Sequence, residues 1–149
     1  MRFRAVLSVA ASAAAALAFA TPANAEGGAF LIRDARSGRC LTVEHGREGA
    51  LGECSPAAAW RVIRRGGDEF QIAEVRGEDR CLRLAPVPIF PPFTDVARCG
   101  EGRDLWQIRR AHEGFVITSA HTDLNLTPRG DRVVAEPGSP AEWHLQPVD

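Results

Sequence analysis

The sequence predicts an all-β domain in which one motif is written three times. A Phe-x-Ile segment, a leucine segment and a Trp-x-aliphatic segment recur in the same order, and the cysteines that begin two of the leucine segments, Cys40 and Cys81, lie 41 residues apart. After residue 25, short runs with strand-like alternation are separated by turn residues, and no amphipathic helix pattern appears. Four strands in each of three units predict twelve strands around a pseudo-three-fold axis, which is a β-trefoil.

The first repeat illustrates how each element is recognised. Its strands are expected near Ala29–Asp34, Cys40–Glu44, 49–53 and 60–65. The alanine-rich stretch 55–59 forms at most one helical turn, and residues 66–68 (Gly-Gly-Asp) turn the chain into the next Phe strand. Residues 66–70 also spell the signature of diguanylate cyclases, but such a domain needs a longer α/β framework, so we interpret them as a hairpin turn.

The large apolar residues of the motif are expected to meet in one shared core, where each buried aliphatic side chain contributes about 1.5–3 kcal/mol. In the third repeat we expect Asp123 and Glu136 at the two cysteine positions, so that this repeat has lost its bridge. The expected core residues are Phe30, Leu41 and Trp60 in the first repeat, Phe70, Leu82 and Trp106 in the second, and Phe115, Leu124 and Trp143 in the third.

Residues 1–25 have the features of a signal peptide. Arg2 and Arg4 precede an apolar stretch at 5–20, and residues 23–25 (Ala-Asn-Ala) match a cleavage site. Removing 25 of the 149 residues leaves 124, which suits one domain over residues 26–149. These carry sixteen arginines and nineteen acidic residues, and the net charge of −3 argues against a nucleic-acid partner. No second apolar run could span a bilayer, so we expect a secreted, extracellular protein.

The four cysteines are expected to form disulfides, because an exported protein meets an oxidising compartment and their number is even. Three pairings are possible. Cys40 and Cys54 are 14 residues apart and Cys81 and Cys99 are 18 apart, whereas structural zinc sites favour much closer pairs. We therefore expect no metal site, and nothing in the sequence indicates a cofactor.

The pattern Cys-Leu-x-Val/Leu, a second Cys and then Trp-x-Val/Ile/Leu resembles the ricin B-chain lectin family over essentially all of residues 26–149. The resemblance implies that Cys40 pairs with Cys54 and Cys81 with Cys99, and that the domain recognises carbohydrate without catalysis. Repeats of this family end in Gln-x-Trp. Here the tryptophan is kept three times, but the glutamine is replaced by Ala58, Asp104 and Ala141.

In this family a sugar is held by an Asp two residues after the first Cys, a stacking ring two residues before the second Cys, and an Asn-Gln pair before the Trp. The first repeat has Thr42, Gly52, Ala57 and Ala58 at these positions. The third has Asn125, Val134, Pro140 and Ala141, which leaves Asn125 as its polar candidate. The second has Arg83, Ala97, Arg103 and Asp104, and Asp95 occupies a further pocket-lining position.

The second repeat is thus the main candidate ligand site. Arg83 and Asp104 stand where the family has an acceptor and an amide, which predicts a planar Arg–carboxylate pair. Two interpretations remain open at this stage. The pair is either a self-satisfied surface ion pair of small energetic value, or part of a site in which Arg83 or Arg103 holds a carboxylate-bearing sugar.

Residues 85–93 form an insertion in the second repeat, and their four prolines predict a stiff, extended loop. Three interpretations are open. The loop packs on itself over an edge of the barrel, or its apolar side chains dock another protein at low ordering cost, or Phe90 or Phe93 replaces the missing stacking ring of a neighbouring pocket.

The sequence lacks familiar catalytic signatures, since its histidines have no H-E-x-x-H spacing and no serine lies in a G-x-S-x-G elbow. We therefore expect a non-enzymatic binding protein, with glycan binding as the leading hypothesis. The alternative is a protein-binding trefoil, such as a protease inhibitor or a toxin-like accessory subunit, that uses residues 85–93. The sequence does not predict the oligomeric state.

Overall fold

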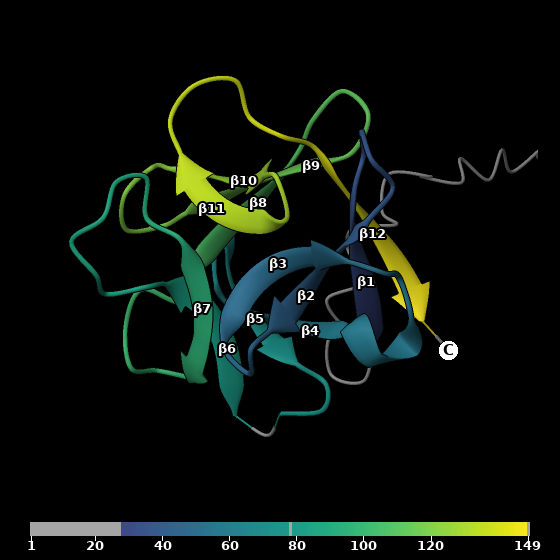
Figure 1. The fold of residues 1–149 in the computed structure, drawn as a ribbon, viewed down its shortest axis with the longest axis horizontal. Coiled ribbons are helices and arrows are strands. Elements are labelled where there is room, and N and C mark those ends of the chain that lie inside the picture. The colour runs from purple at the N-terminus through teal and green to yellow at the C-terminus, as the bar shows by residue number, and fades with distance from the viewer. Residues whose placement is uncertain (1–27, 78, 149) are drawn as a thin grey trace, which may run out of the picture.

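The structure is a computed structural model that describes residues 28–77 and 79–148, and the expected signal peptide at residues 1–25 lies outside the described residues. In the described residues twelve strands are present, as predicted, and they form one connected antiparallel sheet (Figure 1). A short 3₁₀ helix, Pro56–Ala58, lies between β3 and β4. No helix in the described part of the chain is long and apolar enough to cross a membrane. The strands are β1 (Ala29–Asp34), β2 (Cys40–Glu44), β3 (Glu48–Gly52), β4 (Trp60–Gly66), β5 (Glu69–Glu74), β6 (Arg80–Leu84), β7 (Thr94–Arg98), β8 (Trp106–Arg110), β9 (Phe115–Ser119), β10 (Asn125–Arg129), β11 (Arg132–Glu136) and β12 (Trp143–Val148).

The first and last strands of each repeat close into a barrel. β1 pairs with β4 and β12, β5 pairs with β4 and β8, and β9 pairs with β8 and β12, so the pairing returns to its starting strand. Closure leaves no free sheet edge in this ring, which removes a common route to aggregation.

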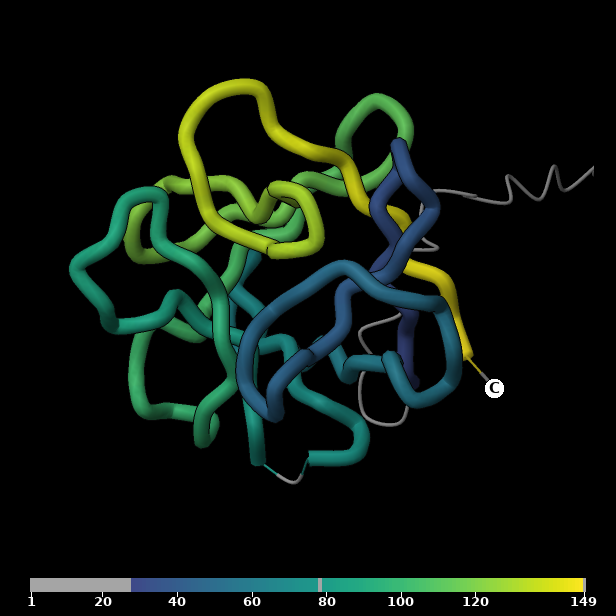
Figure 2. The backbone as a smooth tube through the Cα atoms, in the orientation of Figure 1, coloured from purple at the N-terminus to yellow at the C-terminus, as the bar shows by residue number. Residues whose placement is uncertain are grey.

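The two middle strands of each repeat form a hairpin: β2 with β3, β6 with β7, and β10 with β11. In Figure 2 these hairpins are the blue, teal and yellow-green segments around the centre of the view. They meet through the pairs β3–β7 and β3–β11 and through a bridge between Phe93 and Val134. A closed barrel joined to three hairpins is a trefoil-like architecture.

The three hairpins approach one another closely at Thr94, which is fully buried. Its Oγ1 donates a hydrogen bond of 2.7 Å to the carbonyl of Val133 in the third repeat. On the first repeat it faces Gly49, where a Cβ atom would lie only 2.0 Å from the same Oγ1. Gly49 therefore lets all three repeats pack around one hydroxyl.

The tryptophans of the three repeats are buried at equivalent places and are at most 2% exposed. Each indole Nε1 donates a hydrogen bond to a leucine carbonyl on the second strand of its own repeat, so every repeat is fastened in the same way. The pairs are Trp60 with Leu41 at 3.0 Å, Trp106 with Leu82 at 2.9 Å, and Trp143 with Leu126 at 3.0 Å. Of the other expected core residues, Phe70 is buried, while Phe30, Phe115 and Leu124 are half-buried and pack against the core from its edge.

The third repeat is offset by two residues from the alignment that the sequence predicts. Its tryptophan bonds to Leu126 rather than Leu124. The first cysteine of each bridged repeat pairs with the preceding strand, and in the third repeat Asn125 takes this place. The two cysteine positions are therefore held by Asn125 and Gly138, and the assignment to Asp123 and Glu136 is wrong.

Asn125 replaces the missing bridge with hydrogen bonds. Its Nδ2 donates to the carbonyl of Gly138 at 3.3 Å, and its Oδ1 accepts from Thr118 Oγ1 at 2.9 Å. Gly138 has a φ of +103°, a backbone conformation that side chains such as cysteine strongly disfavour. An amide clamp thus joins the two ends of this hairpin where the other repeats use sulfur.

We predict that Asn125→Ala lowers the free energy of unfolding by about 1–2 kcal/mol, because it removes one half-buried and one exposed hydrogen bond. Urea unfolding followed by circular dichroism measures this change. Ser139→Ala, at an exposed neighbouring position, serves as the control and is expected to change stability by less than about 0.5 kcal/mol. Equal stability of the two variants would contradict a clamp at Asn125.

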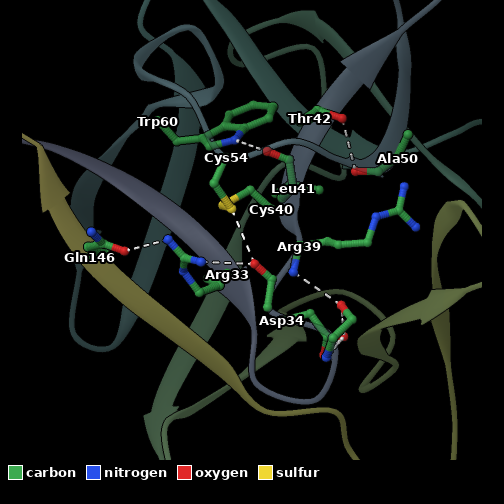
Figure 3. Close-up of a disulfide and its surroundings, with 12 residues drawn as sticks. Arg33, Asp34, Arg39, Cys40, Leu41, Thr42, Ala50, Cys54, Trp60 and Gln146 are labelled. Atoms are coloured by element: carbon green, nitrogen blue, oxygen red, sulfur yellow. Dashed lines mark hydrogen bonds between the residues drawn. A yellow bond between two sulfur atoms is a disulfide. The ribbon is translucent and has the colours of Figure 1, made fainter.

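Both disulfides pair within repeats, as the resemblance implied. Cys40 is bonded to Cys54 and Cys81 to Cys99, with Cα–Cα distances of 5.1 and 4.9 Å, and none of the four cysteines is free. Figure 3 shows the first bridge beside Trp60 and Leu41. The first bridge thus lies next to the tryptophan that closes its repeat.

Candidate functional site

A hollow of about 240 Å³ opens on the first repeat and reaches the end of β5. Its wall combines carboxylates, a guanidinium and hydroxyls with apolar side chains. Three of its residues, Thr42, Ala57 and Ala58, stand at the positions to which the ricin B resemblance assigns sugar contact. The wall also includes Glu53, Ser55, Glu74, Val75 and Arg76.

The framework of this hollow is rigid. The Cys40–Cys54 bridge fixes the segment that carries Glu53 and Ser55, and the indole of Trp60, also part of the wall, is held by the Leu41 carbonyl (Figure 3). A hollow built on such fixed elements needs little ordering when a ligand binds.

Gly52 explains why this repeat has no stacking ring. A Cβ atom at this position would lie 2.9 Å from Thr42 Oγ1. Thr42 itself donates a hydrogen bond to the Ala50 carbonyl at 3.4 Å. An aromatic ring at position 52 would therefore displace Thr42 from its place, so an apolar contact in this hollow has to come from elsewhere. Val75, 42% exposed in the wall, supplies one.

Glu74 is the acidic residue that sequence reasoning missed in this wall. Its Oε2 lies 3.3 Å from Arg80 Nε, is buried, and makes no hydrogen bond to a described residue. Burial raises the pKa of the Glu74 carboxyl, and the positive charge of Arg80 opposes that shift. Glu74 reaches this wall because it pairs directly with Trp60 across β4 and β5, which belong to different repeats.

In the second repeat, Arg83 is paired with Asp95 rather than with Asp104. Arg83 Nε and Nη2 lie 2.8 and 3.3 Å from the two carboxylate oxygens of Asp95, a bidentate arrangement. The hydrogen bond with Asp95 raises the pKa of the Arg83 guanidinium, although burial opposes it. Arg47 from the first repeat also lies 3.4 Å from Asp95. Arg83 therefore has a carboxylate partner, but the partner is Asp95 and not the expected Asp104, and the pair is largely buried rather than on the surface.

Asp104 has a structural role of its own. It is buried, and its Oδ2 accepts hydrogen bonds from the Gly100 backbone at 2.7 Å and from Gln71 Nε2 at 3.1 Å. It therefore closes the loop before β8 instead of facing a ligand. The neighbouring Arg103 is exposed, and within residues 28–77 and 79–148 its guanidinium has no ion-pair partner.

The corrected register of the third repeat also changes its candidate positions. Thr127 and Glu136, rather than Asn125 and Val134, correspond to the family's acidic residue and stacking ring. Glu136 Oε2 forms an ion pair of 3.0 Å with Arg129 Nη2. Asn125 is engaged in the amide clamp and is not placed as a ligand contact.

The inserted loop of residues 85–93 carries two aromatic rings, of which Phe93 is anchored and Phe90 is exposed to solvent. Phe93 is half-buried, bridges to Val134, and has the guanidinium of Arg132 5.9 Å from its ring centre. Phe90 is 73% exposed. Figure 2 shows this teal loop between β6 and β7 projecting from the body of the molecule. Neither ring belongs to the wall of the hollow on the first repeat.

Among the described residues, no group of three or more His, Cys, Asp or Glu side chains is arranged to hold a metal ion.

No family model matches this chain, and no curated protein matches its sequence. Solved structures do resemble it. A designed three-fold symmetric protein, ThreeFoil, has a TM-score of 0.70 at 17% identity, covering 79% of this chain and 97% of that chain. The fold is trefoil-like. The BEL beta-trefoil has a TM-score of 0.66 at 17% identity, with 82% and 94% covered. SeviL, solved with the asialo-GM1 saccharide, has a TM-score of 0.64 at 15% identity, with 79% and 95% covered.

Proposed function

We propose that this protein is a secreted, non-catalytic member of the ricin B-like lectins that binds saccharide in the hollow on the first repeat. The observation that carries the proposal is the position of that hollow. It opens at Thr42, Ala57 and Ala58, where the resemblance places sugar contacts, and it has its own acceptors in Glu53 and Glu74. SeviL, a similar trefoil, is known in complex with a saccharide.

The chemistry of the wall suits a sugar ring. Carboxylates accept hydrogen bonds from hydroxyls more strongly than neutral groups do, and Glu53 and Glu74 place two of them around one hollow. The hydroxyl of Ser55 can donate and accept, and that of Thr42, which donates to the Ala50 carbonyl, can accept. Val75 offers an apolar surface to the C–H face of the ring. The volume of about 240 Å³ suits one ring, so we infer recognition of a terminal residue.

The charge of the wall indicates which sugars are favoured. Glu53 and Glu74 share the wall with the cation Arg76, and Glu74 is also paired with Arg80 at 3.3 Å. The charges of this hollow are thus nearly balanced, which favours a sugar without a carboxylate, because a sialic or uronic acid would add an unpaired negative charge. This differs from the carboxylate-bearing sugar that the sequence suggested for the second repeat, where Arg83 is already neutralised by Asp95.

Protein docking through residues 85–93 is less well supported. The end of the loop is held against the third repeat, since the Pro92 carbonyl accepts from the Ala135 backbone and Phe93 bridges to Val134. Ile89 and Phe90 are its exposed large apolar side chains. Two side chains fall well short of the roughly 800 Å² that each partner buries in a stable protein interface.

A glycan array with the wild-type protein tests the proposed function. We expect signals on glycans with neutral or amino-sugar ends, competed by the free sugar. Glu53→Gln combined with Glu74→Gln is expected to weaken binding to the best of these by about 30-fold, because two charged acceptors become neutral at a cost of about 1 kcal/mol each.

Glu44→Gln is the matched control, because Glu44 is an exposed acid of the same repeat outside the hollow. This variant should bind as the wild type does. A wild-type protein that binds no glycan, or a double variant that binds as tightly as the control, would show that the proposal is wrong.

A further inference from the structure

A second hollow, of about 300 Å³, lies between the inserted loop and the third repeat. One wall comes from the inserted loop, which belongs to the second repeat, and the other wall comes from the third repeat. Of the positions that the resemblance assigns to sugar contact in the third repeat, only Glu136 lies in its wall. The lining residues are Phe90, Pro91, Arg129, Glu136 and Pro137.

The loop that carries Phe90 is anchored at its base and to the third repeat. The Ala85 backbone donates to the Phe93 carbonyl at 2.9 Å, which closes the base of the loop. The Ala135 backbone donates to the Pro92 carbonyl at 2.9 Å, which fastens the loop to β11. The ring of Phe93 is packed under Arg132. Phe90, two residues before Pro92, is left 73% exposed beside the hollow.

The opposite wall is polar and paired. Arg129 and Glu136 form an ion pair of 3.0 Å, with side chains 63% and 23% exposed. Together they present a row of donors and acceptors to the hollow. Vicinal hydroxyls of a sugar donate to a carboxylate and accept from a guanidinium, so an ordered Arg–Glu pair can bind two adjacent hydroxyls without being broken.

We propose that this hollow is a second saccharide site, in which the apolar face of a pyranose ring lies on Phe90 and two of its adjacent hydroxyls bond to Arg129 and Glu136. An exposed aromatic ring opposite a paired carboxylate and guanidinium matches the two unlike faces of a pyranose. A peptide segment would use the aromatic ring but leave the charged pair without hydroxyl partners. The site is independent of the hollow on the first repeat, and the two make the protein bivalent.

Titration of ¹⁵N- and ¹³C-labelled protein with methyl β-D-galactopyranoside and, separately, methyl β-D-glucopyranoside tests this site by NMR. We expect at least one probe to shift the ring signals of Phe90 and the Nε–Hε signal of Arg129 in a saturable way. Phe90→Ala should raise the dissociation constant at this site about tenfold, because the stacking surface is lost. Phe90→Trp should lower it.

Ile89→Ala is the matched control, since it removes an exposed apolar side chain of the same loop that does not line the hollow. It should leave the dissociation constant unchanged. Glu53→Gln with Glu74→Gln should also leave the shifts at Phe90 and Arg129 intact, even if it abolishes binding at the first repeat, so the failure of one site is distinguishable from that of the other.

The proposal is overturned if neither probe shifts Phe90 and Arg129, or if Phe90→Ala and Ile89→Ala affect the titration equally. A loop that instead binds a protein gives the first of these results. Competition between a protein ligand and the sugar at Phe90, in contrast, would be consistent with the saccharide site.

Discussion

Removing both disulfides is expected to lower the free energy of unfolding by about 6 kcal/mol, or about 3 kcal/mol for each bridge. The Cys40–Cys54 and Cys81–Cys99 bridges close loops of 14 and 18 residues, and each restricts the unfolded chain. A loss of this size is comparable with the entire stability of an ordinary domain, which is about 5–15 kcal/mol. Urea unfolding with and without a reductant that cleaves both bridges measures it.

Two double variants separate the bridges, Cys40→Ala with Cys54→Ala and Cys81→Ala with Cys99→Ala. Loop entropy grows only with the logarithm of length, so the two should differ by only about 0.2 kcal/mol on this account. A reduced protein that unfolds at the same urea concentration as the oxidised protein would contradict a stabilising role for the bridges.

Trp106→Ala is expected to cost about 5 kcal/mol. The side chain is fully buried, so its removal leaves a large cavity at about 3–5 kcal/mol, and the Leu82 carbonyl that accepts from its indole loses a partner at about 1 kcal/mol or more. Urea unfolding monitored by far-UV circular dichroism measures this loss of unfolding free energy. Trp106→Phe keeps most of the ring volume and is expected to lose about half as much, which provides a measurement if the alanine variant does not fold.

Val75→Ala is the control for this series, because Val75 is 42% exposed and lies outside the core cluster. We expect a change of less than about 0.5 kcal/mol. If Trp106→Phe changed the free energy of unfolding as little as Val75→Ala does, the buried tryptophans would not be what stabilises the repeats.

The trefoil-like fold could be predicted because its motif is repeated and because its determinants are large and few. A fixed order of Phe, Leu and Trp with strand alternation between turns leaves little choice of architecture. The first repeat forms its strands within one residue of the expected bounds. The pairing of the cysteines could also be predicted, because the repeated motif resembles a family whose bridges lie within repeats.

The register of the third repeat was harder to predict, because the residues around Leu124 and Leu126 offer two similar choices. The correct one was available from spacing. Phe115 and Asn125 are 10 residues apart, as are Phe30 and Cys40. The alignment on Asp123 shortens this distance to 8 residues, which a strand pair of the same geometry does not accommodate.

The candidate sites could be predicted only in part, since they depend on contacts between repeats. Arg83 forms its ion pair with Asp95 rather than with Asp104, because Asp95 lies directly opposite Arg83 across the β6–β7 hairpin. Glu74 reaches the hollow on the first repeat although it belongs to the second. Phe90 faces the third repeat although it too belongs to the second. A pattern read within single repeats does not reveal such neighbours.

A crystal structure of the protein with the glycan that gives the strongest array signal tests the central proposal most directly. We expect a terminal sugar ring in the hollow on the first repeat, with hydroxyls bonded to the carboxylates of Glu53 and Glu74 and a C–H face against Val75. A ring bound elsewhere, with this hollow empty at saturating glycan, would contradict the assignment of saccharide recognition to the first repeat.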